Sequence, residues 1–212
     1  MKKSKNLLLS QSPKTLIIPI ILFIFSIFFK SFKLFFLSLL SLAFLFYFFR
    51  VPDIRVSKGL NSILSPASGK IINIVQNDKF IHFSIFLGIL NPHVQYIPYD
   101  GYLSNTSYMP GTFKFAYLFK KSNYNERKIY NFVTRLGLIS VIQIAGLLGR
   151  RLVSFIEPKT FVKKGMMLGM IKFGSRVDII IPYLPQMSIN KQVGDVVKGG
   201  ESILVKLSGY NF

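Results

Sequence analysis

The sequence contains no cysteine, only two histidines, and only 8 acidic residues among 212. The lack of cysteine excludes disulfides, thiolate nucleophiles and cysteine-rich metal sites, and it fits a reducing compartment. Because the histidines, His82 and His93, are few and carboxylates are also scarce, too few ligands remain for an ordinary metal site. Catalysis by a metal ion is therefore not expected.

Positive charge, in contrast, is abundant. The 27 lysines and arginines give a formal net charge of +19, which favours an anionic partner such as nucleic acid or an acidic lipid surface. The basic residues are scattered, and the aromatic residues that could stack on bases concentrate near the N-terminus, so we do not expect nucleic-acid binding. The length suits one core of ordinary domain size and a short membrane segment.

The first fifty residues are far more apolar than the rest. Residues 15–29 and 34–49 form two apolar runs, separated by Lys30 and Lys33. Each run, as a helix rising about 1.5 Å per residue, falls short of a hydrocarbon core about 30 Å thick. Snorkelling lysines or local thinning can make up the difference. We predict a helical hairpin over residues 1–50, transmembrane or membrane-embedded, with Lys30 and Lys33 at its turn.

Cationic residues flank the hairpin on the side away from this turn. By the positive-inside bias, that side and the domain that follows are cytoplasmic, at the cell membrane. A cleaved signal peptide is the main alternative, but no small-residue cleavage site follows the apolar stretch. A buried helical pair in a soluble core is another, although neither run has a polar face. The flanking cations are Lys2, Lys3, Lys5, Lys14, Arg50, Arg55 and Lys58.

From Val51 onward, short β-branched or aromatic runs alternate with turn-forming pairs such as Asn91-Pro92 and Asp100-Gly101. This pattern predicts a mostly β, antiparallel domain over residues 51–212. The one short helix we expect there runs from Ile144 to Val153. The expected strands are 71–75, 80–86, 140–144, 167–172, 177–181 and 202–207.

Two segments that contain glycine, 65–70 and 193–201, each precede an expected strand. They look like the two edges of a β-hammerhead of the biotinyl or lipoyl kind, because glycine permits positive φ at tight turns. Carrier domains of that kind bear a lysine at a hairpin tip between characteristic partners, and neither Met-Lys-Met nor Asp-Lys-Ala occurs here. A carrier function therefore lacks its attachment point.

Gly174 and Ser175 lie between two apolar strands. A serine that follows glycine in a forced turn can attack the preceding carbonyl, because glycine leaves that carbon sterically open. Gly-Ser pairs are common in turns, so this pair is informative only together with other motifs.

Such motifs are present along most of the chain. They are Phe48 to Arg55, Ser65-Pro66-Ala67-Ser68-Gly69-Lys70, Asn91-Pro92-His93-Val94-Gln95-Tyr96-Ile97-Pro98, Asn125-Glu126-Arg127, Gln143-Ile144-Ala145-Gly146 with Arg150-Arg151, and Lys172-Phe173-Gly174-Ser175-Arg176-Val177-Asp178. In this order the sequence closely resembles the short, membrane-associated phosphatidylserine decarboxylases over essentially its whole length.

The resemblance implies an enzyme that matures by cutting itself. The Ser175 hydroxyl would attack the Gly174 carbonyl to form an ester, and elimination and hydrolysis would leave a pyruvoyl group and ammonia. The chains 1–174 and 175–212 would stay associated. The covalent pyruvoyl cofactor derived from Ser175 would withdraw electrons as carbon dioxide leaves the substrate, without a metal or an external cofactor.

The resemblance also assigns proton transfer to His93, whose imidazole titrates near neutral pH. For His82, inside an expected strand, we expect a structural role. Arg150, Arg151 and Arg176 are candidates for holding a lipid phosphate through forked hydrogen bonds, although each is equally well explained as surface charge.

Two positions depart from the family pattern. The first turn motif usually reads Ser-Pro-Ala-Asp-Gly, and its aspartate is thought to orient or charge-stabilise the histidine. Ser68 stands there, and a hydroxyl cannot stabilise an imidazolium as a carboxylate does. Asp100 or Asp178 is a possible substitute. Relatives also more often carry an acidic residue just before the histidine, where this chain has Asn91-Pro92.

The predicted function is therefore decarboxylation of phosphatidylserine, or a related phosphoserine lipid, to phosphatidylethanolamine in phospholipid biosynthesis. The expected partners are that phospholipid and an anionic membrane. Two alternatives stay open: a catalytically inactive relative that binds lipid, motivated by Ser68, and a membrane-tethered hammerhead adaptor. Oligomeric state and the lipid backbone are not predicted.

Overall fold

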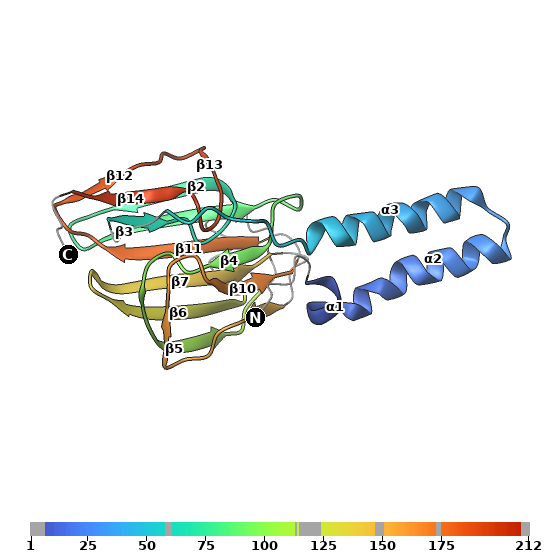
Figure 1. Cartoon of the computed structure of the whole chain (residues 1–212), viewed down its shortest axis with the longest axis horizontal. Helices are drawn as coiled ribbons and strands as arrows, with labels where there is room; N and C mark the ends of the chain where they lie inside the picture. Colours follow the sequence, from blue (N-terminus) through green and yellow to red (C-terminus); the bar gives the residue numbers. More distant parts are fainter. Residues whose placement is uncertain are drawn as a thin grey trace. The chain divides into compact units, whose positions relative to one another are not determined.

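The computed structural model describes residues 7–57, 61–112, 114, 124–146, 151–172 and 175–208. The chain divides into two compact units, Met1–Asp53 and Ile54–Phe212. The first is helical, and the second is built of β-strands (Figure 1). The prediction of a mostly β chain with an N-terminal helical hairpin is confirmed.

The helical unit is an antiparallel hairpin. Its turn contains Lys30, whose φ is 47°, and Ser31, whose Oγ accepts a hydrogen bond from Leu34 N and so caps the second long helix. The Ser38 hydroxyl of one helix donates to the Pro19 carbonyl of the other at 2.8 Å, which fixes their register. The elements are α1 (Leu8–Gln11), the 3₁₀ helix η1 (Pro13–Leu16), α2 (Ile17–Phe28) and α3 (Phe32–Phe48).

Among the described helices, none combines the length and the apolar character needed to reach from one side of a bilayer to the other.

The main element of the β unit is an eight-stranded antiparallel sheet in the order β13-β2-β3-β11-β7-β6-β5-β9 (Figure 1). Strand β11 lies in its interior and pairs with β3 on one side and β7 on the other. The strands are β2 (Gly69–Gln76), β3 (Phe80–Leu87), β5 (Gly101–Met109), β6 (Arg127–Thr134), β7 (Gly137–Ala145), β9 (Thr160–Val162), β11 (Ser175–Pro182) and β13 (Val196–Val197).

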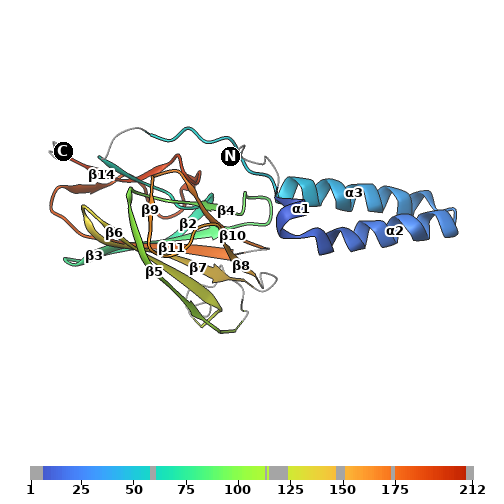
Figure 2. The same ribbon diagram turned by 60° about the horizontal axis from the view of Figure 1, so that its bottom comes forward.

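Two three-stranded antiparallel sheets complete the unit. One has the order β1-β14-β12 and the other β4-β10-β8. In both views β4 and β10 lie beside β7 and β11 of the large sheet (Figure 2). The strands are β1 (Ser62–Leu64), β14 (Ile203–Leu207), β12 (Met187–Ile189), β4 (Val94–Tyr96), β10 (Met167–Ile171) and β8 (Leu152–Ser154).

The core of the β unit follows from the two-residue period of its strands. In β11, Val177, Ile179 and Ile181 belong to one apolar cluster, while Arg176 and Asp178 point to the opposite face. Ser175 shares the face of the apolar residues. The nucleophile predicted from the sequence therefore sits at the end of a core-facing row.

All six predicted strands are confirmed, with bounds that differ by at most a few residues. The prediction of a helix from Ile144 to Val153 is wrong, because Ile144 lies in β7 and Val153 lies in β8. Apolar residues on successive positions fit a sheet buried on both faces as well as they fit a helix. The long strands β5 and β6 were not predicted, because polar residues interrupt both.

Candidate active site

Ser175 is the first residue of β11 and is fully buried. It pairs with Leu87, the last residue of β3, and with Ala145, the last residue of β7. Among the described residues, its Oγ has no hydrogen-bond partner. Leaving a hydroxyl unsatisfied in a protein interior costs about 1–3 kcal/mol, so such an atom calls for a functional explanation.

His93 is also fully buried and directly precedes β4. Its carbonyl accepts a hydrogen bond from Ile171 N at 3.2 Å, at the end of β10. Ile171 is four residues before Ser175, so their Cα atoms are at most about 14 Å apart. The structure therefore brings the predicted base and the predicted nucleophile to the same end of the two neighbouring sheets.

A chain of buried polar groups runs from the large sheet to His93. Tyr130 OH donates to Gln143 Oε1 (3.0 Å), Gln143 Nε2 donates to Gln95 Oε1 (2.7 Å), and Gln95 Nε2 donates to the His93 carbonyl (2.7 Å). All four residues are fully buried. Burial raises the pKa of Tyr130 to about 12, against a smaller opposing effect of a hydrogen bond with Ser154, so the phenol remains a donor.

This polar chain is a feature that sequence reasoning missed. Gln95 and Gln143 belong to motifs that resemble the family, but no role was predicted for them. The available signal was their position in strand alternation: Gln143 shares the core-facing row of β7 with Val141 and Ala145. Such a row buries a polar side chain only where a partner satisfies it.

Lys172 directly follows β10 and is 6% exposed. Its N–H donates to the Arg151 carbonyl at 3.3 Å, so the two cations are neighbours across the β8/β10 pair. Burial, and secondly the charge of Arg151, lowers the pKa of Lys172. Like charges side by side in a sheet are unfavourable, and an anion between them would relieve the repulsion. This pair of neighbouring cations lies close in sequence to Ser175, because Lys172 precedes it by three residues.

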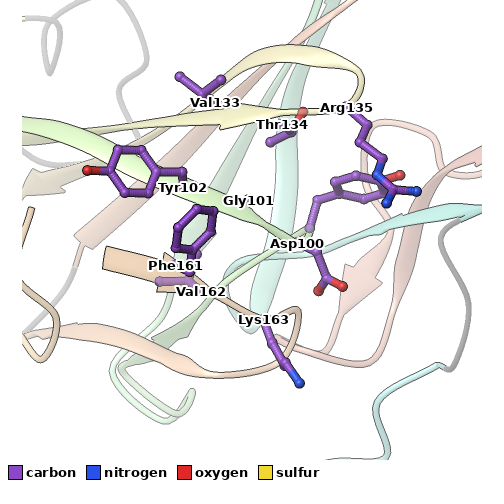
Figure 3. Close-up of a pocket in the computed structure, with 10 residues that line it drawn as sticks. Asp100, Gly101, Tyr102, Val133, Thr134, Arg135, Phe161, Val162 and Lys163 are labelled. Atoms are coloured by element: carbon purple, nitrogen blue, oxygen red, sulfur yellow. The ribbon is translucent and has the colours of Figure 1, made fainter. Parts of the chain in front are cut away.

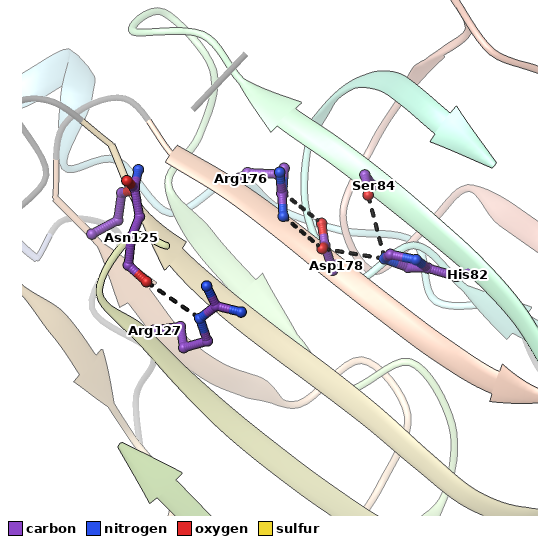
Figure 4. A network of polar contacts seen from close by, with 7 residues as sticks. His82, Ser84, Asn125, Arg127, Arg176 and Asp178 are labelled. Carbon is purple, nitrogen blue, oxygen red and sulfur yellow. Dashed lines mark hydrogen bonds and ion pairs between the residues drawn. The ribbon is translucent and has the colours of Figure 1, made fainter. Parts of the chain in front are cut away.

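The opposite face of β11 carries a buried ion pair (Figure 4). Arg176 contacts both carboxylate oxygens of Asp178, with Nε 2.9 Å from Oδ1 and Nη2 3.0 Å from Oδ2. His82 Nε2 lies 3.2 Å from Asp178 Oδ2 and 3.4 Å from Ser84 Oγ. Because both contacts use the same ring nitrogen, Ser84, His82 and Asp178 do not form a proton relay. The Arg176 fork, predicted as a phosphate ligand, binds a carboxylate instead.

The two other side chains considered as orienting partners of the histidine are engaged elsewhere. Ser68 Oγ accepts a hydrogen bond from Gly199 N at 2.9 Å. Asp100 Oδ1 accepts one from Lys164 N at 2.6 Å. Of the remaining predicted site residues, Gly174 and Arg150 lie outside the described residues.

An open pocket of about 540 Å³ lies at the other end of the large sheet (Figure 3). It includes Thr134, which pairs with Gly137 at the start of β7, whereas Ser175 pairs with Ala145 at the end of that strand. Nine residues of strand separate the two ends by about 27 Å. The pocket is therefore distinct from the nucleophile. Its walls include Tyr102, Arg135, Phe161 and Lys163.

Comparison with known proteins shows the family of the chain. The profile of the phosphatidylserine decarboxylase family matches residues 41–205. The chain belongs to the phosphatidylserine decarboxylase family.

Three similar relatives are each named phosphatidylserine decarboxylase proenzyme. That of Syntrophus aciditrophicus is 40% identical over 168 residues, which cover 74% of this chain and 77% of the relative. That of Rickettsia bellii is 40% identical over 169 residues, covering 74% and 72%. That of Ehrlichia chaffeensis is 39% identical over 170 residues, covering 76% and 74%.

Phosphatidylserine decarboxylase proenzymes use a pyruvoyl group formed from a serine of their own chain. The residues present here fit that group. Ser175 is buried at a strand end, and its Oγ makes no hydrogen bond within the described part of the chain, so its hydroxyl is not needed for the fold.

Proposed function

We propose that the protein decarboxylates phosphatidylserine, or a related phosphoserine lipid, to the corresponding ethanolamine lipid after cleaving itself between Gly174 and Ser175. Membership of the family supports the reaction class. The single observation that carries the site assignment is the buried Ser175 hydroxyl, which has no hydrogen-bond partner among the described residues. The predicted products of maturation are the chains 1–174 and 175–212.

Maturation uses this chain's own residues. Ser175 Oγ attacks the Gly174 carbonyl carbon, and its proton passes to His93 and then to the departing nitrogen, so that an ester replaces the amide. Removal of the Ser175 α-proton expels the Gly174 carboxylate and leaves a dehydroalanine. Water then releases ammonia and leaves the ketone. Atoms balance with one water consumed and one ammonia released.

In the mature enzyme, the pyruvoyl group supplies an electron-withdrawing carbonyl that accepts the electron pair left by departing carbon dioxide. The protein's own contribution is burial and charge. Ser175 and His93 are both fully buried, which limits the access of bulk water to the reacting end of β11. His93 is the group we assign to proton delivery there.

We assign the lipid phosphodiester to Lys172 and Arg151. A cation that gripped the substrate carboxylate would stabilise the charge that has to leave, and so would oppose the reaction. The phosphodiester keeps its charge throughout, so cations can bind it without that penalty. Burial, and secondly the charge of Arg151, lowers the pKa of Lys172, so a bound phosphodiester would stabilise its charged form.

The helical hairpin over residues 1–50 is proposed to anchor the protein in the cell membrane, with the β unit on the cytoplasmic side. The support is exposed apolar surface: Phe28 is 79% exposed and Phe32 is 89% exposed, on either side of the turn at Lys30. Contiguous apolar surface of this kind marks a membrane or protein contact. The cations that flank the hairpin favour the cytoplasmic orientation.

For the β unit, taken as residues 51–212, we propose a β-hammerhead-like arrangement at one edge of the large sheet. Val196 and Val197 of β13 pair with Lys70 and Gly69 of β2, so segments 65–70 and 193–201 lie side by side. Lys70 belongs to a paired strand rather than to a hairpin tip. This favours a scaffold over a carrier.

Intact mass of the purified, membrane-extracted protein tests the function. We expect two chains, divided between Gly174 and Ser175, with a pyruvoyl group blocking the smaller one, and release of carbon dioxide from phosphatidylserine. Ser175→Ala should leave one uncleaved, inactive chain. Ser84→Ala is the matched control, because Ser84 is a buried serine of the neighbouring strand, and it should still be cleaved. A single chain in every sample would instead favour an inactive lipid-binding relative, the alternative that Ser68 motivates.

A further inference from the structure

The imidazole of His93 has a defined tautomer. Its Nδ1 lies 2.7 Å from the carbonyl oxygen of Asn91. A carbonyl oxygen can only accept a hydrogen bond, so at this distance Nδ1 must carry the proton. In the neutral ring the lone pair is then on Nε2, which makes Nε2 the atom that can take a proton from a hydroxyl.

Asn91 is itself held in place. Its Oδ1 accepts a hydrogen bond from Gly88 N at 2.9 Å, and its own N–H donates to the Gly88 carbonyl at 2.9 Å. The following residue is Pro92, which restricts Asn91 to extended backbone conformations. The carbonyl that orients the ring is therefore part of a closed and stiff turn.

This turn begins next to the nucleophile. Leu87, the residue before Gly88, pairs directly with Ser175 across β3 and β11. On the other side of the histidine, the His93 carbonyl accepts hydrogen bonds from Gln95 Nε2 and Ile171 N. The main chain of His93 is thus fixed on both sides. The turn from Gly88 to Asn91, which follows β3, precedes it, and the end of β10 binds its carbonyl.

The side chains expected from the sequence to orient the ring have other partners. Ser68 binds Gly199 N, Asp100 binds Lys164 N, and Asp178 binds Arg176 and His82. The Nδ1 atom instead faces the neutral main-chain carbonyl of Asn91.

We propose that Asn91 is a positioning residue for self-cleavage, which holds His93 through its main-chain carbonyl in the tautomer that presents Nε2 as the base. The pair of His93 and Ser175 then works with a main-chain carbonyl as the acceptor from Nδ1. The inference rests on the proposed function, in that Ser175 is the hydroxyl that loses its proton. A neutral acceptor orients an imidazole but stabilises the imidazolium less than a carboxylate does.

The tautomer can be measured without any reaction. The uncleaved Ser175→Ala proenzyme, labelled with ¹⁵N in its histidines, has only two imidazoles, and His82→Gln identifies the His93 signals. Above the titration range of the ring we expect a proton on Nδ1 and none on Nε2. Ser68→Ala should keep this tautomer, and Asn91→Ala should give a mixture of both. A proton on Nε2 in the parent, or loss of the Nδ1 proton in Ser68→Ala, would overturn the proposal.

Cleavage kinetics supply a second test. Asn91→Ala should slow the appearance of the small chain on the order of tenfold to a hundredfold, within the range of general acid–base contributions. Asn91→Asp keeps an oxygen for Gly88 N and should restore most of the rate. Asn77→Ala is the matched control, because Asn77 Oδ1 accepts from Lys79 N and Phe80 N in the turn at the other end of β3, and it should cleave at the parental rate.

The two proposals fail in different ways. A chain that never cleaves but shows the expected His93 tautomer would refute the proposed function and leave the orienting contact of Asn91 intact. A chain that cleaves normally with the proton on Nε2, or with Asn91→Ala at the parental rate and tautomer, would refute the role of Asn91 alone.

Discussion

Gln143 and Gln95 join the large sheet to the β4-β10-β8 sheet through one hydrogen bond of 2.7 Å between two fully buried amides. The bond requires one orientation of each amide, because Gln143 also accepts from Tyr130 and Gln95 also donates to the His93 carbonyl. A continuous chain of hydrogen bonds therefore connects the core of the large sheet with the main chain of the proposed base.

Breaking this chain of hydrogen bonds should lower the stability of the fold. Gln143→Leu leaves Tyr130 OH and Gln95 Oε1 without their partner, so we expect a loss of about 2 kcal/mol in the free energy of unfolding and slower self-cleavage. Urea unfolding in detergent, on the Ser175→Ala background, measures the first effect, and intact mass over time on the cleavable chain measures the second. Gln76→Leu, an exposed position on β2, should change neither. Unfolding of Gln143→Leu at the parental urea concentration would contradict this role.

Tyr130 should make stability depend on pH at the alkaline end. Its folded-state pKa is raised to about 12 by burial, whereas in the unfolded chain the phenol ionises near its ordinary value of about 10. Between these values the folded state keeps a proton that the unfolded state has lost, so stability falls as pH rises through this window. Tyr130→Phe should unfold at a midpoint that changes less between about pH 9 and about pH 11. Tyr124→Phe, at an exposed position, should behave as the parent.

Lys172 should lower the stability of the fold at neutral pH and contribute to substrate binding. With its pKa lowered by burial, the folded state loses the proton before the unfolded state, so this group adds stability as pH rises toward 10.5. Lys172→Met should therefore raise the unfolding midpoint at neutral pH and reduce that slope. If Lys172 binds the phosphodiester, KM should rise roughly tenfold while kcat changes little. Lys206→Met, at an exposed position of β14, is the control, and an unchanged KM in Lys172→Met would remove the assignment.

The ion pair of Arg176 and Asp178 should be far more sensitive to loss of one member than of both. Arg176→Met leaves a buried carboxylate with His82 as its remaining described partner, and we expect a cost of about 3 kcal/mol. The double variant Arg176→Met with Asp178→Leu removes both charges and should recover most of that loss. Denaturant unfolding of the three proteins measures the coupling. Equal destabilisation by the single and double variants would indicate that packing dominates.

The hairpin should determine membrane attachment. Replacing Phe28, Phe29 and Phe32 by serine removes the most exposed apolar side chains at the turn, and we expect much weaker association with phosphatidylglycerol-containing vesicles in a flotation assay. Replacing Phe161 by serine provides the control, because that side chain is 82% exposed on the β unit. Equal loss of flotation in both proteins would show that the hairpin is not the membrane contact.

Strands with a strong apolar signal could be predicted from the sequence, and weakly patterned ones could not. Residues 80–86 are rich in Ile and Phe, and they form β3 almost as expected. Strand β5 carries Ser104, Asn105, Thr106 and Ser107 in a row, and it is stabilised by pairing with β6 rather than by local preference. Tertiary pairing of this kind has no local signature.

The sequence signal for the candidate site is limited in the same way. Ser175 and His93 were singled out because their motifs resemble a family, and the structure places both at one end of the neighbouring sheets. The orienting contact of Asn91 could not be predicted, because it is made by a main-chain carbonyl, which every residue possesses. Lys172 could not be singled out either, since its burial depends on how β8 and β10 pair.

The interior place of β11 has a consequence for the cleaved protein. Strands β11 to β14 all follow Ser175, and they pair with β1, β2, β3 and β7, which all precede Gly174. Once the peptide bond is cut, the 38-residue chain 175–212 would stay paired with strands of the larger chain. It would not dissociate without global unfolding. Renaturation would then become a bimolecular process, with a yield that falls on dilution, whereas the uncut Ser175→Ala chain would refold at a rate independent of its concentration.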